Sequence, residues 1–228
     1  NSYSKSKEIT KESSNENNDP SELKLKLVIN TTNLLDSHSD VHIKGIWNKS
    51  VKESKGVLLL QEHKMTFNSI IGEGLTPSVK VMNWSELASN LKGNTEALIL
   101  DGSINKDRNP FMFEQYQKGY VKEHSVGMRY VKVELAINSD KKYFAEEKEI
   151  WEKYIDQVAN KEDAEDLGYF WAVLEAKVVE GSAVVKGSNH ITPVLEMQAV
   201  KSLDENKNEP SPDTQQIEML KSLLTKFN

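Results

Sequence analysis

Apolar and polar positions alternate most clearly in residues 121–137, which read V-K-E-H-S-V-G-M-R-Y-V-K-V-E-L-A-I. In the second half of this segment the apolar positions recur at every second residue: Val131, Val133, Leu135 and Ile137. A period of two predicts a half-buried β-strand. Continued backwards without a bulge, the same alternation places Ser125 and Gly127 on the core-facing side of the strand.

Similar patterns predict further strands along the chain, at residues 23–29, 57–61, 69–74, 77–82, 96–100, 169–185 and 191–200. Helical spacing, capping residues and glycines predict helices at residues 47–54, 84–93, 110–118 and 143–160. Strands and helices do not alternate regularly, so the pattern favours an α+β fold over a doubly wound one. We expect an antiparallel barrel or sheet with peripheral helices.

The two ends of the chain differ from the middle. Residues 1–20 are mainly Ser, Lys, Glu and Asn, which predicts a disordered tail. Residues 21–200 are expected to form the folded domain. Residues 201–228 combine a polar linker with a short amphipathic helix, whose apolar side would dock on the domain or on a partner.

Composition narrows the classes of function. The net charge is −6, and Arg108 and Arg129 are the only arginines, which argues against a nucleic-acid partner. The mean hydropathy is −0.59, and no apolar run in the middle of the chain approaches membrane length, so no membrane is expected. The absence of cysteine excludes disulfides, thiolate zinc sites and a cysteine nucleophile, and it fits a reducing compartment.

Three residues suggest nucleophilic serine chemistry, which needs a hydroxyl, a base and a group that orients the base. Ser125 is the candidate nucleophile, and His63, at the end of an apolar strand, is the candidate base. His124 adjoins Ser125 and would point to the opposite face, so it is a poor base. Alternation in residues 169–185 places Glu180 on an apolar face, where a carboxylate is rare unless it is paired.

Two further features offer alternatives. Glu175 lies on the other face of the same predicted strand as Glu180, where it could pair with Lys177 in solvent. The segment D-S-H-S-D-V-H carries acids and histidines that would point the same way if it were extended: Asp36, His38, Asp40 and His42. Such a set suits a divalent metal and a metal-dependent hydrolase, although turn chemistry alone also explains it.

Five short motifs occur in a characteristic order: D-S-H-S-D-V-H-I-K-G-I-W, L-L-L-Q-E-H, H-S-V-G-M-R-Y-V-K, L-E-A-K-V-V-E-G-S-A-V and G-S-N-H-I-T-P. Together they cover roughly residues 23–198, and they resemble the tailed-bacteriophage prohead (capsid maturation) serine proteases. The resemblance implies the fold of the herpesvirus assemblins, a small antiparallel β-barrel surrounded by helices. It also implies a serine endopeptidase that needs no cofactor or metal.

The resemblance assigns roles to particular residues. The family's histidine at a strand end matches His63, and the serine of its S-[IV]-G motif matches Ser125. Its later acidic residue matches Glu180, with Glu175 in reserve; assemblins use a second histidine here, so the acid is a departure. By analogy with assemblins, the oxyanion would be bound by backbone N–H groups of the loop that contains Gly187, Ser188 and Asn189.

The resemblance further implies partners and a location. The substrates would be the scaffolding protein, the precursor of the major capsid protein and the protease itself. They would be cut inside proheads assembling in the host cytoplasm, or the chain would be encoded by a bacterial prophage. Self-cleavage would fall in residues 1–20 or 202–213, and a homo-oligomer is possible on this pattern. A non-catalytic capsid-assembly or scaffolding module on the same fold is the alternative.

Overall fold

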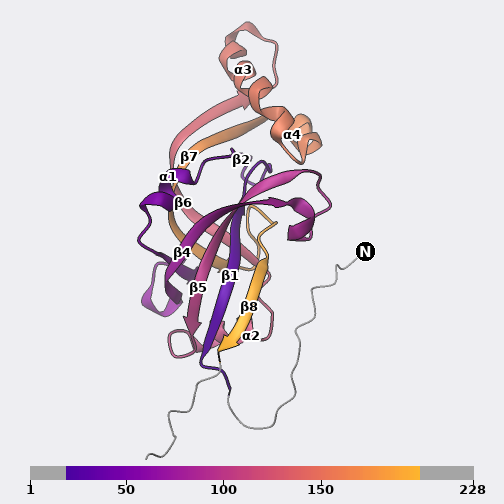
Figure 1. Ribbon diagram of the computed structural model, residues 1–228. Helices are drawn as coiled ribbons and strands as arrows, with labels where there is room; N and C mark the ends of the chain where they lie inside the picture. Colours follow the sequence, from indigo (N-terminus) through magenta and orange to yellow (C-terminus); the bar gives the residue numbers. More distant parts are fainter. Residues whose placement is uncertain (1–18, 201–228) are drawn as a thin grey trace, which may run out of the picture.

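The computed structural model describes residues 19–200, where the strands form one eight-stranded sheet and the helices are few and short (Figure 1). The strands are β1 (Glu22–Thr31), β2 (Asp40–His42), β3 (Val57–Gln61), β4 (Ile70–Asn83), β5 (Asn94–Asn105), β6 (Glu123–Ile137), β7 (Tyr169–Val184) and β8 (Val194–Val200). The helices are α1 (Asn48–Glu53), α2 (Pro110–Gln117), α3 (Ala145–Tyr154) and α4 (Lys161–Leu167), with short 3₁₀ turns between them. This arrangement agrees with the predicted α+β class.

The sheet is open and mixed, which corrects the expectation of a closed antiparallel barrel. The strand order is β2-β7-β3-β4-β5-β1-β8, with β6 on the other edge of β7. The pairings of β7 with β2 and β3 are parallel, and the remaining ladders are antiparallel. No ladder joins β6 to β8 among residues 19–200; instead, Thr192, in the chain leading to β8, contacts His124 of β6, whose backbone N–H donates to the Thr192 hydroxyl and whose Nδ1 lies 2.9 Å from the Thr192 carbonyl oxygen.

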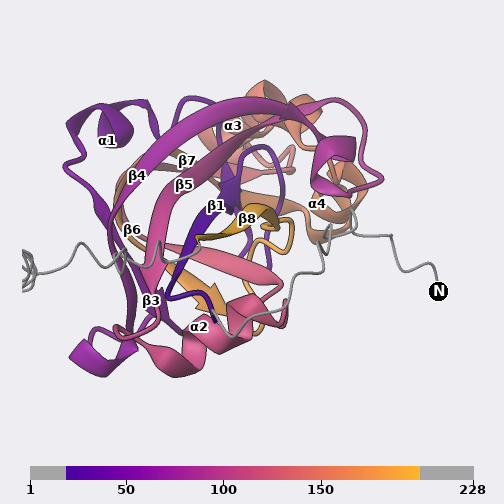
Figure 2. The same ribbon diagram turned by 60° about the horizontal axis from the view of Figure 1, so that its bottom comes forward.

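The sheet nevertheless curves around a central apolar cluster, as the arching of β4 and β5 in Figure 2 shows. Residues from strands at both ends of the strand order contribute to this core: Leu25 and Leu27 from β1, Leu100 from β5, Val126 from β6 and Ala183 from β7. Alternation of inward and outward side chains along each strand supplies these positions. Where β6 and β7 pair beside Val126 and Ala183, the side chains between these core residues point to the opposite face of the sheet, which we call the outer face.

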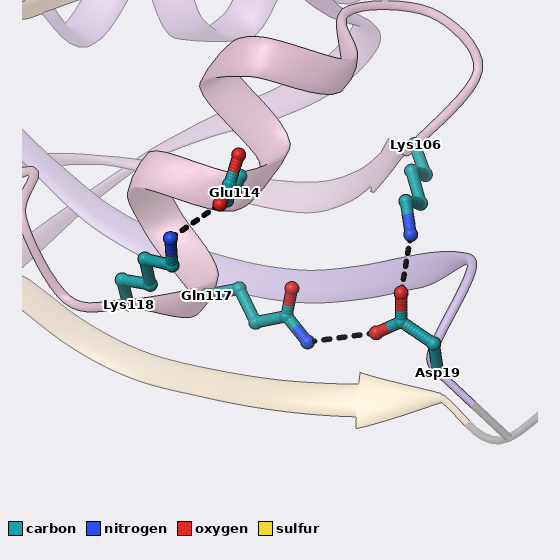
Figure 3. A network of polar contacts seen from close by, with 5 residues as sticks. All are labelled: Asp19, Lys106, Glu114, Gln117 and Lys118. Atoms are coloured by element: carbon teal, nitrogen blue, oxygen red, sulfur yellow. Dashed lines mark hydrogen bonds and ion pairs between the residues drawn. The ribbon is translucent and has the colours of Figure 1, made fainter. Parts of the chain in front are cut away.

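Helix α2 closes one end of the core with Met112, Phe113 and Tyr116. Asn109 caps the helix, because its side-chain oxygen accepts a hydrogen bond from the Met112 N–H at 3.1 Å, and Gly119 follows the helix with a positive φ of 68°. Exposed polar contacts join this helix to the start of the described chain (Figure 3). Asp19 accepts from Lys106 and from Gln117, and Lys118 pairs with Glu114.

Helices α3 and α4 lie beside the far ends of β6 and β7, away from α2 (Figure 1). They enclose a second apolar cluster, in which Trp151 and Tyr154 of α3 pack with Ala136 of β6 and Phe170 of β7. The sequence predicted one helix over residues 143–160. The helix instead ends at Tyr154, and α4 follows as a separate element that was not predicted.

Several other boundaries differ from the predictions. The two strands expected at residues 69–74 and 77–82 are one strand, β4, and the strand expected at residues 96–100 continues through Asp101 and Gly102 as part of β5. The helix expected at residues 84–93 is a single 3₁₀ turn, Trp84–Leu87, begun by a capping box between Asn83 and Glu86. Ladder hydrogen bonds to neighbouring strands outweigh the local turn preferences of glycine in both long strands.

Among residues 19–200, no helix has the length and apolar character needed to cross a bilayer. The tail predicted for residues 1–20 lies almost entirely outside the described residues, as do the linker and helix predicted for residues 201–228.

Candidate functional site

A histidine–carboxylate pair lies on the outer face of the sheet. Nδ1 of His63 is 2.6 Å from Oε1 of Glu180, so the turn after β3 contacts the C-terminal part of β7. The register explains the meeting, because β3 runs parallel to β7 with Leu58 opposite Glu180 and Leu60 opposite Ser182. The chain leaving β3 therefore turns back over the two polar side chains of β7.

The turn that carries His63 has an unusual backbone. Glu62 and His63 are consecutive non-glycine residues with positive φ values, 53° and 55°. Left-handed conformations are costly for such residues and persist only where surrounding contacts hold them. Here the His63 N–H donates to Oγ of Ser182 at 3.0 Å, and the Glu62 carboxylate accepts the N–H of Val185 at 2.9 Å.

Glu180 is a buried carboxylate with two hydrogen-bond partners. Its side chain is 2% exposed, and its oxygens accept from His63 and from the Ser182 hydroxyl, which lies 2.7 Å from Oε2. These bonds offset part of the cost of burying a charge. Ser182, which is itself buried, thus links the carboxylate to the histidine backbone, a supporting role that the sequence pattern did not indicate.

The same pair sets the protonation of His63. Its hydrogen bond to Glu180 is the main cause that raises the pKa of His63 above its ordinary value of 6.5, while partial burial opposes the shift. The imidazole is 42% exposed, so its other nitrogen, Nε2, can be reached from solvent. With Nδ1–H donating to the carboxylate, neutral His63 presents an Nε2 lone pair that can accept a proton.

Ser125 lies on the same face as this pair. In an unbroken register, Ser125 is directly opposite Ser182 and Gly127 is opposite Glu180. Directly opposite side chains share a face, with Cβ atoms about 4.5–5.5 Å apart. Ser125 is half-buried, and within residues 19–200 no hydrogen bond joins its hydroxyl to His63. The structure therefore brings His63 and Glu180 together, and it places Ser125 opposite Ser182, the residue that bonds both of them.

The face on which Ser125 lies corrects the sequence prediction. His124 and Val126 point into the core, so Ser125 and Gly127 are on the outer face. The extrapolated alternation fails because the β6–β7 ladder shifts register between Gly127 and Met128 and again on both sides of Lys132. Consistent with the prediction for His124, its ring turns away from Ser125, and its Nε2 is 3.0 Å from the Tyr116 hydroxyl.

Gly127 makes room for the carboxylate. A Cβ atom at this position would lie 1.9 Å from Oε1 of Glu180 and 2.7 Å from its carboxyl carbon. Any side chain here would displace the carboxylate from His63. Position 127 must therefore be glycine for the Glu180 carboxylate to keep its place. The Ser125 hydroxyl lies two residues before this glycine, on the same face of β6.

The loop expected to bind an oxyanion is only partly free. The Gly187 N–H already donates to the Glu123 carboxylate at 3.0 Å, and the Asn189 side chain is bonded to Thr31. Within the described chain, the backbone N–H groups of Ser188 and Asn189 make no hydrogen bond. These two N–H groups are the remaining candidates in the predicted set.

The other candidates lie elsewhere. Glu175 pairs with Lys49 at 3.2 Å, not with Lys177, and it does not contact His63. Asp36, Asp40 and His42 are gathered in one buried group, whereas His38 is exposed and lies outside it.

A pocket of about 450 Å³ adjoins the turn that carries His63. Its lining includes Glu62 from that turn, Phe111 from the start of α2, Tyr120 from the segment after α2, and Val184 and Val185 at the end of β7. Most of these side chains are apolar, and three of them are strongly exposed: Phe111, Tyr120 and Val185. His63, Ser125 and Glu180 do not line this pocket, which adjoins them through Glu62. Exposed aromatic side chains around an apolar pocket are typical of a binding surface.

Neither the family models nor the curated proteins nor the solved structures that were searched contain a match to this chain.

Proposed function

We propose that the protein is a serine endopeptidase in which Ser125 is the nucleophile, His63 the base and Glu180 the group that orients the base. The observation that carries the proposal is the 2.6 Å bond from His63 to a buried carboxylate on the face that Ser125 shares. A buried carboxylate on Nδ1 selects the tautomer with a free Nε2 and stabilises the imidazolium that forms during the reaction. Both properties are what a general base for a serine requires.

The proposed reaction has two stages. Nε2 of His63 removes the proton from Ser125 Oγ as the oxygen attacks the peptide carbonyl, and it then delivers that proton to the leaving nitrogen as the C–N bond breaks. Water, deprotonated by His63, hydrolyses the resulting ester. The Ser125 hydroxyl must rotate towards Nε2 for the first step. Catalytic hydrogen bonds are often loose in the free enzyme and form fully only when the substrate binds.

We also propose which substrates the peptidase cleaves and where it cleaves them. The pocket beside Glu62 suits an apolar side chain of an extended peptide. Resemblance of the ordered motifs to prohead proteases supports the scaffolding protein, the major capsid precursor and the chain itself as substrates, inside an assembling prohead. It also supports kinship of the curved sheet with the assemblin barrel.

Labelling with a biotinylated fluorophosphonate tests the chemistry without knowledge of the substrate. The full chain should be labelled on Ser125, and Ser125→Ala should lose labelling and self-processing by roughly a thousandfold or more. Ser78→Ala, an exposed serine on β4, is the matched control and should behave as the wild type. Processing that persists in Ser125→Ala contradicts the proposal. A wild-type chain that neither takes the label nor processes itself or a co-expressed capsid precursor favours the non-catalytic assembly module.

A further inference from the structure

The turn between β1 and β2 holds a buried group of side chains that the peptidase proposal does not use. Asp36, Asp40 and His42 each bring a carboxylate oxygen or a ring nitrogen within 4.8 Å of the others. Pairing between Leu35 and Val41 folds the segment back on itself, so that the two aspartates lie opposite each other. Asp40 and His42 lie two residues apart on β2 and therefore share a face.

His42 provides a second, independent sign of a ligand. Its side chain is 1% exposed, and its Nε2 is a buried nitrogen without any hydrogen-bond partner in the described chain. Unpaired buried polar atoms are uncommon in folded proteins. Nδ1 is occupied, since it lies 2.9 Å from the side-chain amide of Asn30. Nε2 is therefore the nitrogen that remains open for a ligand.

The amide of Asn30 suits a metal-binding histidine. Its oxygen, Oδ1, is also buried without a partner in the described chain, and a half-turn of the amide would let this oxygen accept a hydrogen bond from Nδ1–H of His42. Nε2 of His42 would then carry a lone pair towards a cation. Histidines that bind metals usually donate their second ring N–H to an oxygen in this way.

The two carboxylates are already oriented. Oδ1 of Asp36 accepts the backbone N–H groups of His38 at 2.8 Å and Asp40 at 3.0 Å. Oδ2 of Asp40 accepts the hydroxyl of Tyr130 from β6. Within residues 19–200, one carboxylate oxygen of each aspartate therefore accepts hydrogen bonds, and the other oxygen accepts none.

We propose that Asp36, Asp40 and His42 bind one divalent first-row metal ion of the zinc type, with Tyr130 as a positioning residue on Asp40. One nitrogen and two oxygen donors suit Zn²⁺, whereas Ca²⁺ and Mg²⁺ prefer oxygen donors alone. The inference does not depend on Ser125 or on peptidase activity.

The contacts around the turn indicate a structural role for the ion. The Trp171 N–H of β7 donates to Ser39 O at 2.8 Å, and the Ser37 N–H donates to Ser188 O at 3.2 Å. Tyr130 adds a contact from β6. An ion at this position would therefore hold together the turn, the β6–β7 pair and the loop that contains Ser188.

Titration of the EDTA-treated full chain with ZnCl₂ tests the site. We expect one zinc ion per chain by calorimetry and a rise in Tm of about 5–10 °C at a hundredfold excess over Kd. CaCl₂ at the same concentration should leave Tm unchanged. Asp36→Asn, which preserves the shape of the side chain, should weaken zinc binding at least tenfold.

Two matched variants locate the ion. His38→Ala removes the exposed histidine of the same segment, and His63→Ala removes the histidine of the candidate active site; both should keep the zinc response. Absence of zinc binding, an equal response in Asp36→Asn, or loss of the response in either control overturns the proposal. If Asp36→Asn does not fold, Co²⁺ added to the wild type decides, because a protein-bound ion should give stronger visible absorption than aqueous Co²⁺.

Discussion

At the scale of single residues, Glu180 and Glu175 differ in burial and in the residue with which each one pairs. Both are acids on β7, but Glu180 is buried against His63 and Glu175 pairs with Lys49 near solvent. Only the first can set the tautomer and charge of the His63 imidazole. Exposed ion pairs of the second kind contribute little.

Glu180→Gln should lower kcat by roughly a thousandfold or more, because a neutral amide cannot stabilise the imidazolium. The pH profile gives a second readout. His63 acts as a base only when neutral, so activity of the wild type should rise with pH through a His63 pKa above 6.5. In Glu180→Gln the hydrogen bond that raises this pKa is lost, and the rising limb should move to lower pH.

Glu175→Gln is the matched control for this experiment and should leave both kcat and the pH profile unchanged. Peptidase assays from pH 5 to 9, with an NMR titration of the His63 ring, make the comparison. A greater loss of activity in Glu175→Gln than in Glu180→Gln would show that the wrong acid has been assigned.

At the scale of elements, the β6–β7 ladder determines the site through the spacing of its backbone. Gly127→Ala should break the bond between His63 and Glu180, since the new Cβ would lie 1.9 Å from the carboxylate oxygen. We expect activity to fall roughly a hundredfold or more, and the His63 pKa to decrease because it loses its main stabilising contact.

Gly119→Ala serves as the control for glycine substitution. Gly119 has a positive φ of 68°, and a Cβ atom added there would meet nothing within 4 Å. Its replacement should therefore cost about 1 kcal/mol of stability through backbone strain and leave the His63 titration unchanged. Wild-type activity in Gly127→Ala, measured with the same peptide substrate, would contradict the proposed geometry.

The β6–β7 ladder also shows which parts of the fold and of the candidate site could be predicted from the sequence. Periodicity located β6 and β7, and it singled out Ser125 and Glu180, because strand patterns and rare polar residues are local signals. The face of Ser125 could not be predicted, since register shifts beside Gly127 and Lys132 depend on the partner strand. The supporting role of Ser182 was equally hidden, because it depends on a turn more than a hundred residues earlier in the chain.

For the whole molecule, the curved sheet buries a histidine whose protonation opposes folding. His124 is fully buried, and desolvation lowers its pKa to about 4. Nδ1–H of the neutral ring can donate to Thr192 O, while Nε2 accepts from Tyr116. The unfolded chain binds a proton below its ordinary pKa of 6.5, so stability is present above that pH and is lost as pH falls towards 4.

His124 should therefore contribute up to about 3 kcal/mol of acid destabilisation between pH 6.5 and pH 4. His124→Asn should be less stable at pH 7, because Tyr116 loses its acceptor, but its stability should fall less steeply in acid. Urea unfolding in EDTA at several pH values measures both effects. His42, whose pKa burial also lowers to about 4, should retain part of the slope. An unchanged slope in His124→Asn would remove His124 as a cause.

The meeting of His63 with Glu180 has a consequence for the timing of activity. The pair is 117 residues apart in sequence, and it joins through parallel strands, a pairing that forms slowly because a long loop must close first. A chain still emerging from the ribosome has Ser125 and His63 but lacks the acid until β7 is synthesised. If the chain is the proposed peptidase, catalytic competence would arrive only once β7 has joined the sheet, and the unfinished chain and its neighbours would be protected from premature cleavage.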